Sequence, residues 1–469
     1  MPGSDPLTVV LALAGVAGAW LIGSVAHPLI GQLNGPMCAG VAYGVGLVWI
    51  SLAIPVAAFL GWPLTDRAGL GLVIGCPLAW WLGRRVVDVR RRADRTSDGP
   101  VVRRETLLAR DPVWGGFVAA LVVLAVIVAV RALVKPLVGW DAWAVHSFKA
   151  KVIVLAQAIP PSLFGWIGAP NYPLGIPLQE VWMAWVVGAW NEVAVKLLFP
   201  GYLVAIWLIV YGTLRERWSP RGAIAGTLFV AGMPLALQHG QDAYLDLPTA
   251  YFLLGSGVAL MRYAVGADRR DLALASVFAA GAVWTREDAL VVIAVNVVLL
   301  GVVLARPSRR AVMSRVADLL LYGALPVAVW GAWSIAKLQM GIVSNLDVGP
   351  AAWVWQFDRF RVVVVVFIRS LFLEGNWLLL WGLFVVALVF ARDAAREPWS
   401  LFLVWPVVVY LLSMGLLMEA TELFDYVSVS TVVNRLILHV APLAALWVAM
   451  TYGRWWGLAE SPRGDRVEG

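Results

Sequence analysis

The sequence predicts an all-α polytopic membrane protein. Of its 469 residues, 61% are hydrophobic and 14% are charged, whereas a soluble domain is roughly 45–50% apolar and about 25% charged. A water-soluble monomer has too little interior to bury so much apolar surface. The apolar residues also form long runs separated by short loops that carry arginine. Together these observations exclude a cytosolic enzyme, a disordered chain and a disulfide-stapled secreted module.

The apolar runs are candidates for membrane-spanning helices, each of which needs about 20 mostly apolar residues. They predict about 13 spans, at residues 7–28, 38–60, 68–83, 113–135, 194–213, 223–238, 247–265, 271–285, 288–305, 317–338, 375–391, 400–418 and 436–452. A further run, 174–190, contains Trp182, Trp185 and Trp190. We expect it to be a helix that lies in the outer interface without crossing, because only then do all the arginine clusters fall on one side.

The basic charge orients these spans. The net charge of the chain is +7. Its arginines cluster in short loops, and the positive-inside rule places these loops in the cytoplasm. The N-terminus is then outside and the C-terminus inside, in a plasma (inner) membrane. Topology rather than nucleic-acid binding explains the charge. The outer face receives the segments 136–193, 239–247, 286–288, 339–374 and 419–435.

Four regions follow from this topology. Residues 1–83 are expected to form three leading transmembrane helices, and residues 84–112 an arginine-rich cytoplasmic linker. Residues 113–452 are expected to form the main transmembrane core, and residues 453–469 a cytoplasmic tail. The outer segments of the core hold most of the charges outside the arginine clusters, so we look for chemistry there.

The first outer segment contains Asp141, where a span leaves the membrane, followed by His146, Lys149 and Lys151. A carboxylate at a membrane exit can act as general base for a hydroxyl, and the lysines can hold a phosphate. The competing interpretation is an interfacial helix with tryptophan anchors and snorkelling lysines. Further along, Tyr172 lies in a proline-rich stretch that forces an extended entry into the next apolar run.

Acidic residues recur at two later turns between spans. Asp242 and Asp246 precede a predicted span, and a carboxylate at bilayer depth is costly, which makes it functional more often than not. Alternatively, Asp246 caps the helix that begins there. Glu287 and Asp288 lie at a second membrane lip. The alternative there is that Arg286 pairs with one of these two acids and simply ends its helix.

The late pair Arg435 and His439 is four residues apart, which predicts that both side chains share one helix face. Arginine is a planar, two-pronged phosphate ligand, so the pair is a candidate clamp for a lipid phosphate. Alternatively, Arg435 anchors a helix end by pairing with the acids just before it.

Known cofactor motifs are missing from the sequence. The four histidines show no HExxH or other close spacing, so no metal site is predicted, and a divalent metal is left open. There is no P-loop, GxSxG or strand-borne GxGxxG, so neither an ATPase nor a serine hydrolase is supported and no cofactor is expected.

In their order and their predicted side, these features resemble the GT-C superfamily of membrane glycosyltransferases. The chain looks most like the branch that includes aminoarabinose transferases and protein O-mannosyltransferases. The resemblance covers roughly residues 113–452. The motifs that carry it are Asp141, the Tyr-Pro-rich entry Asn171–Pro177, the Asp-x-Pro stretch Asp246–Pro248, the lip Thr285–Asp288, and the late Asn434, Arg435, His439 and Pro442.

The resemblance implies a GT-C-like bundle that moves a sugar from a polyprenyl-phosphate donor to an acceptor hydroxyl at the outer face, with inversion. The acceptor would be a glycan, a lipid or a protein. Asp141 matches the catalytic base and Asp246 the second acidic position. The residues expected to bind substrate are Asp242, Lys149, Lys151, His146, Tyr172, Glu287, Asp288, Arg435 and His439. Two departures from the family are the three leading spans and the lack of a large soluble C-terminal domain.

Three other functions compete with this interpretation. A transporter or flippase of a lipid-linked or small polar substrate would need charged or broken helices near the midplane. A ligase or polymerase of the O-antigen type would need several arginines in a late outer loop, which Arg359, Arg361 and Arg369 supply. A non-catalytic scaffold is the fourth, weakest reading.

Overall fold

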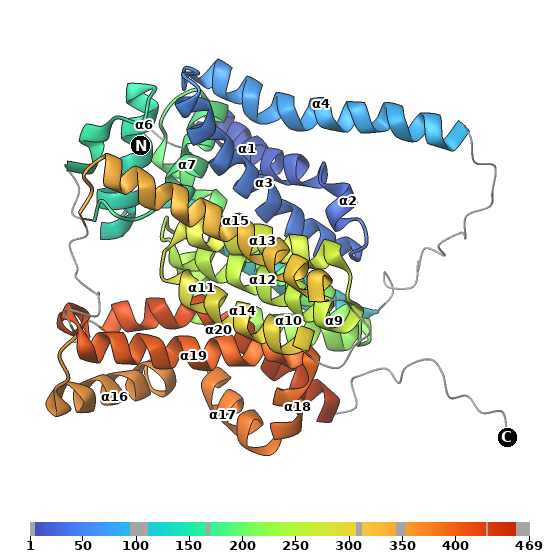
Figure 1. Ribbon diagram of the computed structural model, residues 1–469, viewed down its shortest axis with the longest axis vertical. Helices are drawn as coiled ribbons and strands as arrows, with labels where there is room; N and C mark the ends of the chain where they lie inside the picture. Colours follow the sequence, from blue (N-terminus) through green and yellow to red (C-terminus); the bar gives the residue numbers. More distant parts are fainter. Residues whose placement is uncertain are drawn as a thin grey trace.

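The computed structural model describes residues 5–93, 111–165, 169–305, 312–343, 353–427 and 430–455, and every secondary-structure element in these ranges is a helix (Figure 1). Most of the expected linker and of the expected tail lies outside the described residues. The helices pack into one bundle in which α12 (Asp246–Gly266) and α13 (Arg269–Thr285) are central.

Seven helices are long and apolar enough to cross a membrane, which makes the chain a multi-pass helical membrane protein. They are α1 (Pro6–Ser24), α3 (Gly35–Phe59), α5 (Pro112–Val134), the run Glu192–Arg215 that joins α8 and α9, α15 (Val312–Gln339), α19 (Pro398–Ala420) and α20 (Ser430–Trp455). The other six expected spans stay predictions. Two of these correspond to the shorter apolar helices α14 (Ala289–Ala305) and α17 (Leu380–Phe390).

The leading helices pack tightly against each other and against the core. At the crossing of α1 and α3, a Cβ on Gly23 would lie 1.7 Å from the Ala42 carbonyl oxygen. Small residues permit this approach, as is common between membrane helices. On its other side α3 meets α9 (Leu198–Arg215), where the Tyr43 hydroxyl donates to the Leu198 carbonyl at 2.8 Å. The fourth leading element, α4 (Asp66–Ala93), extends beyond this contact at the top of Figure 1.

The arginines expected in the cytoplasm meet at one end of the bundle. Arg262 pairs there with Asp271 at 3.1 Å, and Arg269 pairs with Asp318 at 2.7 Å. Asp111, which caps α5, pairs with Arg221 at the start of α10 (Pro220–Ala231). This arginine-rich end is on the right in Figure 1, and α6 (Ser147–Ala156) and α7 (Gly175–Val187) lie at the opposite end.

In three segments the structure shows detail that the sequence does not predict. The helix expected at the interface, α7, is short but buried beneath α1, α3 and α6. Trp182 is 2% exposed and donates its indole N–H to the Gly15 carbonyl. The expected span 223–238 is interrupted between α10 and α11 (Pro234–His239), because Pro234 has no backbone N–H to continue the helix. The expected outer segment 339–374 contains α16 (Phe357–Phe372), which packs along α19 and α20.

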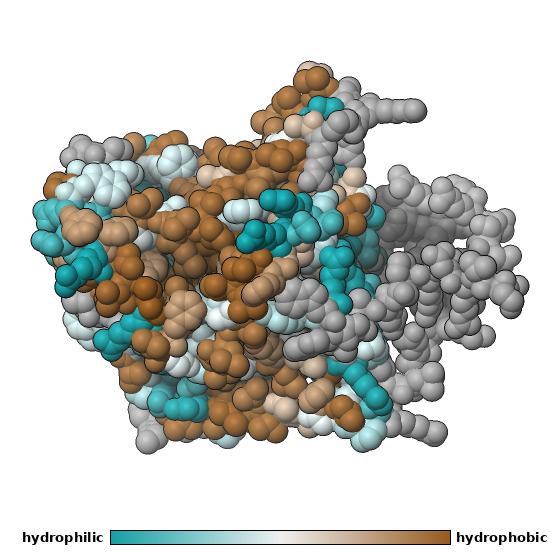
Figure 2. Space-filling model, turned by 90° about the horizontal axis from the view of Figure 1, so that it is seen from below, coloured by the Kyte–Doolittle hydropathy of each residue, from teal (hydrophilic) through white to brown (hydrophobic). Residues whose placement is uncertain are grey.

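The outer surface of the bundle is largely apolar. Figure 2 shows the face formed around α16 to α19, where brown side chains cover the middle and teal ones gather toward the left and right. Phe360, Val365 and Ile368 of α16 and Leu412 of α19 are among the exposed apolar residues. Contiguous exposed apolar surface of this kind is what a lipid-facing wall requires.

Candidate active site

Asp246 is the centre of the polar network at the end of the bundle opposite the arginine-rich end. It is the first residue of α12 and is fully buried. Its Oδ1 lies 2.9 Å from Arg286 Nη1 and 3.0 Å from His439 Nε2, and its Oδ2 lies 2.8 Å from Arg435 Nε. The capping interpretation is wrong, since Leu245 is the N-cap residue of α12 and the Asp246 carboxylate binds the side chains of Arg286, Arg435 and His439 instead. The positive end of the α12 dipole also favours a carboxylate at this position.

Asp246 and four other side chains close a ring of hydrogen bonds. From Asp246 the ring runs through His439 to the Tyr410 hydroxyl, which lies 2.7 Å from His439 Nδ1 and 3.0 Å from Asp288 Oδ2. Asp288 Oδ1 lies 3.0 Å from Arg286 Nε, and Arg286 returns to Asp246. The ring joins α12, the α13–α14 turn, α19 and α20, so the site is fixed by helices that are far apart in sequence.

Arg435 connects this ring to the segment that contains Asp141. Its Nη1 lies 2.6 Å from Asp141 Oδ2, and its Nε contacts Asp246. The Asp141 side chain is 33% exposed, whereas that of Asp246 is 0% exposed. Asp141 is therefore the carboxylate of this pair that a substrate can reach without first opening the network.

A local irregularity of the backbone follows Asp141. Asp141 precedes a single π-helical turn, Ala142–His146, which leads into α6. Such turns are rare and occur frequently at functional sites. The turn buries His146, whose ring meets Tyr172 edge-on at 5.3 Å between centroids. The Tyr172 ring in turn lies 5.5 Å from the guanidinium carbon of Arg286.

The site lies below the ends of the neighbouring helices. Tyr410 is ten residues before the end of α19 at Ala420. At 1.5 Å per residue, Tyr410 is about 15 Å from that end along the helix axis. By contrast, α12 begins at Asp246 and α14 begins just after Asp288. Asp246 and Asp288 thus lie at the beginnings of α12 and α14, whereas α19 continues past the level of Tyr410.

Several ionisable groups at this end have shifted pKa values. Burial opposes ionisation of Asp288, but Arg286 and His439 outweigh it and hold its pKa well below the usual range. Burial lowers the pKa of His239 to about 4, although Asp246 works in the opposite direction. Burial likewise lowers the pKa of Lys149 to about 7. Asp288 is thus a permanent anion, and His239 is a neutral neighbour 3.6 Å from Asp246.

Several predicted residues meet in one network. Asp141, Asp246, Asp288, Arg435 and His439 are linked directly, and Tyr172 and His146 adjoin it through Arg286. The prediction that Arg435 and His439 share a helix face is confirmed, because both reach Asp246. The alternative partners of Arg435, the acids just before it, are replaced by Asp141 and Asp246.

Four predicted residues lie outside this network. Lys149 is fully buried and donates to the Pro170 and Tyr172 carbonyls, at 3.2 and 2.8 Å, so it supports the loop rather than a phosphate. Asp242 accepts from the backbone N–H groups of Gly139 and Ala243.

Glu287 pairs with Lys337 outside the network, and the Lys337 Nζ lies 2.6 Å from the Glu287 Oε1. Lys151 is exposed on α6. Of the pairing alternatives for Arg286, the one with Asp288 is confirmed, but Arg286 also binds Asp246.

The sequence did not identify four members of the site. Arg286 lies in the Thr285–Asp288 lip but is not among the predicted site residues, and Tyr410 lies inside an apolar run without any polar neighbour in sequence. His239 and Tyr244 stack at 5.0 Å, and Tyr244 also lies 4.8 Å from the Arg435 guanidinium carbon. The only available signal was the density of polar residues in the stretch 239–246.

Metal binding receives no geometric support in the described part of the chain, where no group of three or more His, Cys, Asp or Glu side chains is arranged to hold an ion. No known protein family matches this chain, and a search of curated proteins finds no match either. The function must therefore be argued from the site itself.

Proposed function

We propose that the protein is a membrane glycosyltransferase that moves a sugar from a polyprenyl-phosphate donor to an acceptor hydroxyl at the outer face. The observation that carries the proposal is the pairing of a reachable carboxylate, Asp141, with Arg435, which is itself anchored on the buried Asp246. A hydroxyl acceptor needs a base and a phosphate leaving group needs cations. Asp141 supplies the base and Arg435 supplies a cation, and the two side chains are in direct contact.

Asp141 is the general base in this proposal. It removes the proton of the acceptor hydroxyl as the oxygen attacks the anomeric carbon, and the bond from that carbon to the donor phosphate oxygen breaks in the same step. The configuration inverts, and the lipid phosphate leaves with the electron pair of the broken bond. With a side chain 33% exposed, Asp141 is accessible to an acceptor that arrives from water.

Arg435 and Arg286 are the cations nearest to the reacting groups. Both are bound by carboxylates in the resting protein, with Arg435 between Asp141 and Asp246 and Arg286 between Asp246 and Asp288. A phosphate has the geometry to replace a carboxylate on a guanidinium. We propose that donor binding draws Arg435 away from Asp141, which frees the base at the same time.

The role proposed for Asp246 is positioning. It is buried and fixes Arg286, Arg435 and His439 from one carboxylate. Preorganised donors lower the barrier because they need not reorient as charge develops on the leaving phosphate. A substrate has no direct path to Asp246 in this state, so it holds the cations rather than contacting the sugar.

A transporter is the second candidate, and one observation favours it. Two breaks between helices meet, since the Leu235 backbone N–H after the α10–α11 break donates to the Asn376 carbonyl in the α16–α17 break at 3.4 Å. Glu374, in the same break, pairs with Arg369 at 3.1 Å and with Asn434. Facing helix breaks with polar groups are typical of transporter substrate sites.

A transfer assay on the purified protein separates the two candidates. Polyprenyl phosphates carrying radiolabelled mannose, glucose or arabinose are offered in detergent with a membrane lipid extract as acceptor. The glycosyltransferase proposal expects label from one donor in a new product. Movement of the intact donor across sealed vesicles, with no new product from any of the three sugars, would instead support the transporter.

A further inference from the structure

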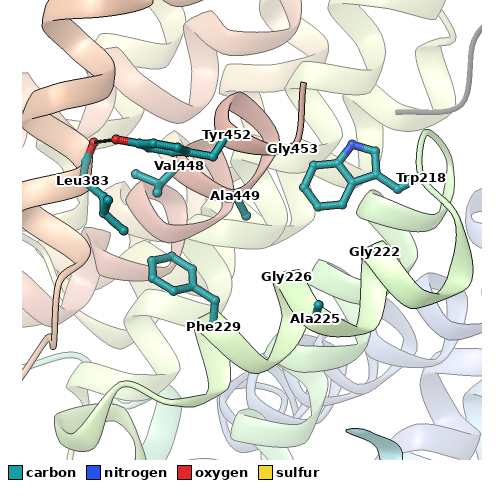
Figure 3. Close-up of a pocket in the computed structure, with 10 residues that line it drawn as sticks. All are labelled: Trp218, Gly222, Ala225, Gly226, Phe229, Leu383, Val448, Ala449, Tyr452 and Gly453. Atoms are coloured by element: carbon teal, nitrogen blue, oxygen red, sulfur yellow. Dashed lines mark hydrogen bonds between the residues drawn. The ribbon is translucent and has the colours of Figure 1, made fainter. Parts of the chain in front are cut away.

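An apolar recess of about 180 Å³ lies between α10, α17 and α20, toward the arginine-rich end and away from the candidate active site (Figure 3). Among its lining residues are Ala225 and Phe229 of α10, Leu383 of α17, and Ala449 and Tyr452 of α20. Its walls are almost entirely carbon. The Tyr452 hydroxyl is directed at the Leu383 carbonyl, 3.3 Å away, rather than into the space.

Small side chains create this recess. Gly222, Ala225 and Gly226 follow one another along the α10 wall, and Ala449 and Gly453 do so on α20. Larger side chains at these positions would fill the space between the two helices. Trp218 closes the far end, and a Cβ on Gly453 would lie only 1.9 Å from its ring. The result is a slot wide enough for a slender apolar group.

Two arginines flank the Trp218 end of the slot. Arg217 precedes Trp218, and Arg454 follows Gly453. The guanidinium carbons of both lie 5.7 Å from the ring centre of the same residue, Trp399. Two like charges thus lie near one aromatic ring, and their mutual repulsion favours an anion or solvent beside them.

The acids near these arginines are already occupied. Glu216, next to Arg217 in sequence, is bound by Arg262, and Asp271 is bound by Arg262 as well. Within the described ranges, no carboxylate lies within ion-pair distance of Arg217 or Arg454. The neighbouring Arg221 differs in this respect, because it is paired with Asp111.

We propose that this recess binds an anionic phospholipid of the bilayer leaflet at the arginine-rich end, with an acyl chain between α10, α17 and α20 and the phosphate between Arg217 and Arg454. The slot matches an acyl chain in polarity, and the two cations match the headgroup in charge. The positive-inside rule makes this the cytoplasmic leaflet, where anionic lipids attract basic residues by about 1 kcal/mol each. The inference does not depend on the proposed glycosyltransferase activity.

Native mass spectrometry of the purified, delipidated protein tests this proposal. The protein is titrated with phosphatidylglycerol or with phosphatidylcholine of the same chain length. We expect tighter binding of phosphatidylglycerol, and a rise in its dissociation constant of about fivefold for each of Arg217→Gln and Arg454→Gln, the fold-change that corresponds to the loss of one such cation. Arg392→Gln, an exposed arginine at the same end, is the matched control and should bind as wild type.

A second variant tests the acyl slot. Ala225 is exposed at the recess, so Ala225→Phe fills the slot without displacing the core. It should abolish specific binding of phosphatidylglycerol, whereas Ala120→Phe, at an exposed alanine of α5, should not. Equal binding of the two lipids, unchanged binding by Ala225→Phe, or a second copy of the chain in place of lipid would each overturn the proposal.

Discussion

Arg435 Nε lies 2.8 Å from Asp246 Oδ2 in the interior of the bundle, and the two side chains are 19% and 0% exposed. A buried carboxylate without partners would be neutralised or excluded, so this guanidinium and that of Arg286 together permit Asp246 to be charged there. The same guanidinium holds Asp141 at 2.6 Å on its outer side. The buried charge and the accessible carboxylate are thus coupled through a single residue.

Replacing Asp246 with Asn should destabilise the protein strongly. The change leaves Arg286 and Arg435 buried without their shared anion, and breaking a buried pair in this way costs about 3–5 kcal/mol. Thermal unfolding in detergent, followed by intrinsic tryptophan fluorescence, should show a clear fall in the midpoint. A midpoint equal to that of wild type would show that Asp246 is not the anchor of the network.

Replacing Tyr410 with Phe should have a smaller effect. The ring stays in place, but Asp288 and His439 lose the hydroxyl that lies 3.0 and 2.7 Å from them. A buried hydrogen-bonding group left unsatisfied costs about 1–3 kcal/mol. The same unfolding assay should therefore rank this variant between wild type and Asp246→Asn, and a loss as large as that of Asp246→Asn would contradict the ranking.

Lys149 should make stability depend on pH. Its pKa is lowered by burial to about 7, below the ordinary value of 10.5 that it regains when unfolded. Between these values the unfolded state binds more protons than the folded state, so stability rises with pH from about 7 towards 10. Lys149→Met should lose this part of the slope. Parallel slopes for the variant and wild type would exclude Lys149 as its source.

Glu287→Gln should leave both folding and transfer close to wild type. Its partner Lys337 lies outside the ring, and both side chains are partly exposed, at 25% and 20%. Exposed pairs of this kind contribute roughly 0–1 kcal/mol. A change in the unfolding midpoint as large as that of Asp246→Asn, or a loss of transfer, would show that Glu287 is part of the active site. The variant is also a matched carboxylate control for the others.

The sequence predicts the helical membrane class and much of the site, because both depend on local signals. Long apolar runs predict α5, α15 and α20 directly, and spacing alone places Arg435 and His439 on one face. Asp141 and Asp246 are identified by their position at the ends of apolar runs, since a carboxylate near lipid is energetically costly and is therefore usually functional.

The remaining features depend on packing, which composition does not specify. α7 has the tryptophans of an interfacial helix, yet α1 and α3 cover it. Lys149 has the charge of a phosphate ligand, yet its nearest acceptors are the carbonyls of a loop that begins about twenty residues later. Tyr410 becomes part of the site only because α19 and α20 lie side by side, so no sequence neighbour marks it.

The most direct measurement is sugar transfer by Asp141→Asn beside wild type and Glu287→Gln, each first shown to be folded by its unfolding transition. Removing a positioned general base typically costs about 10²–10⁴-fold in rate. We expect Asp141→Asn to lose transfer by at least about 100-fold while Glu287→Gln retains it. Transfer by folded Asp141→Asn at the wild-type rate would remove Asp141 from the role of base and contradict the proposed mechanism.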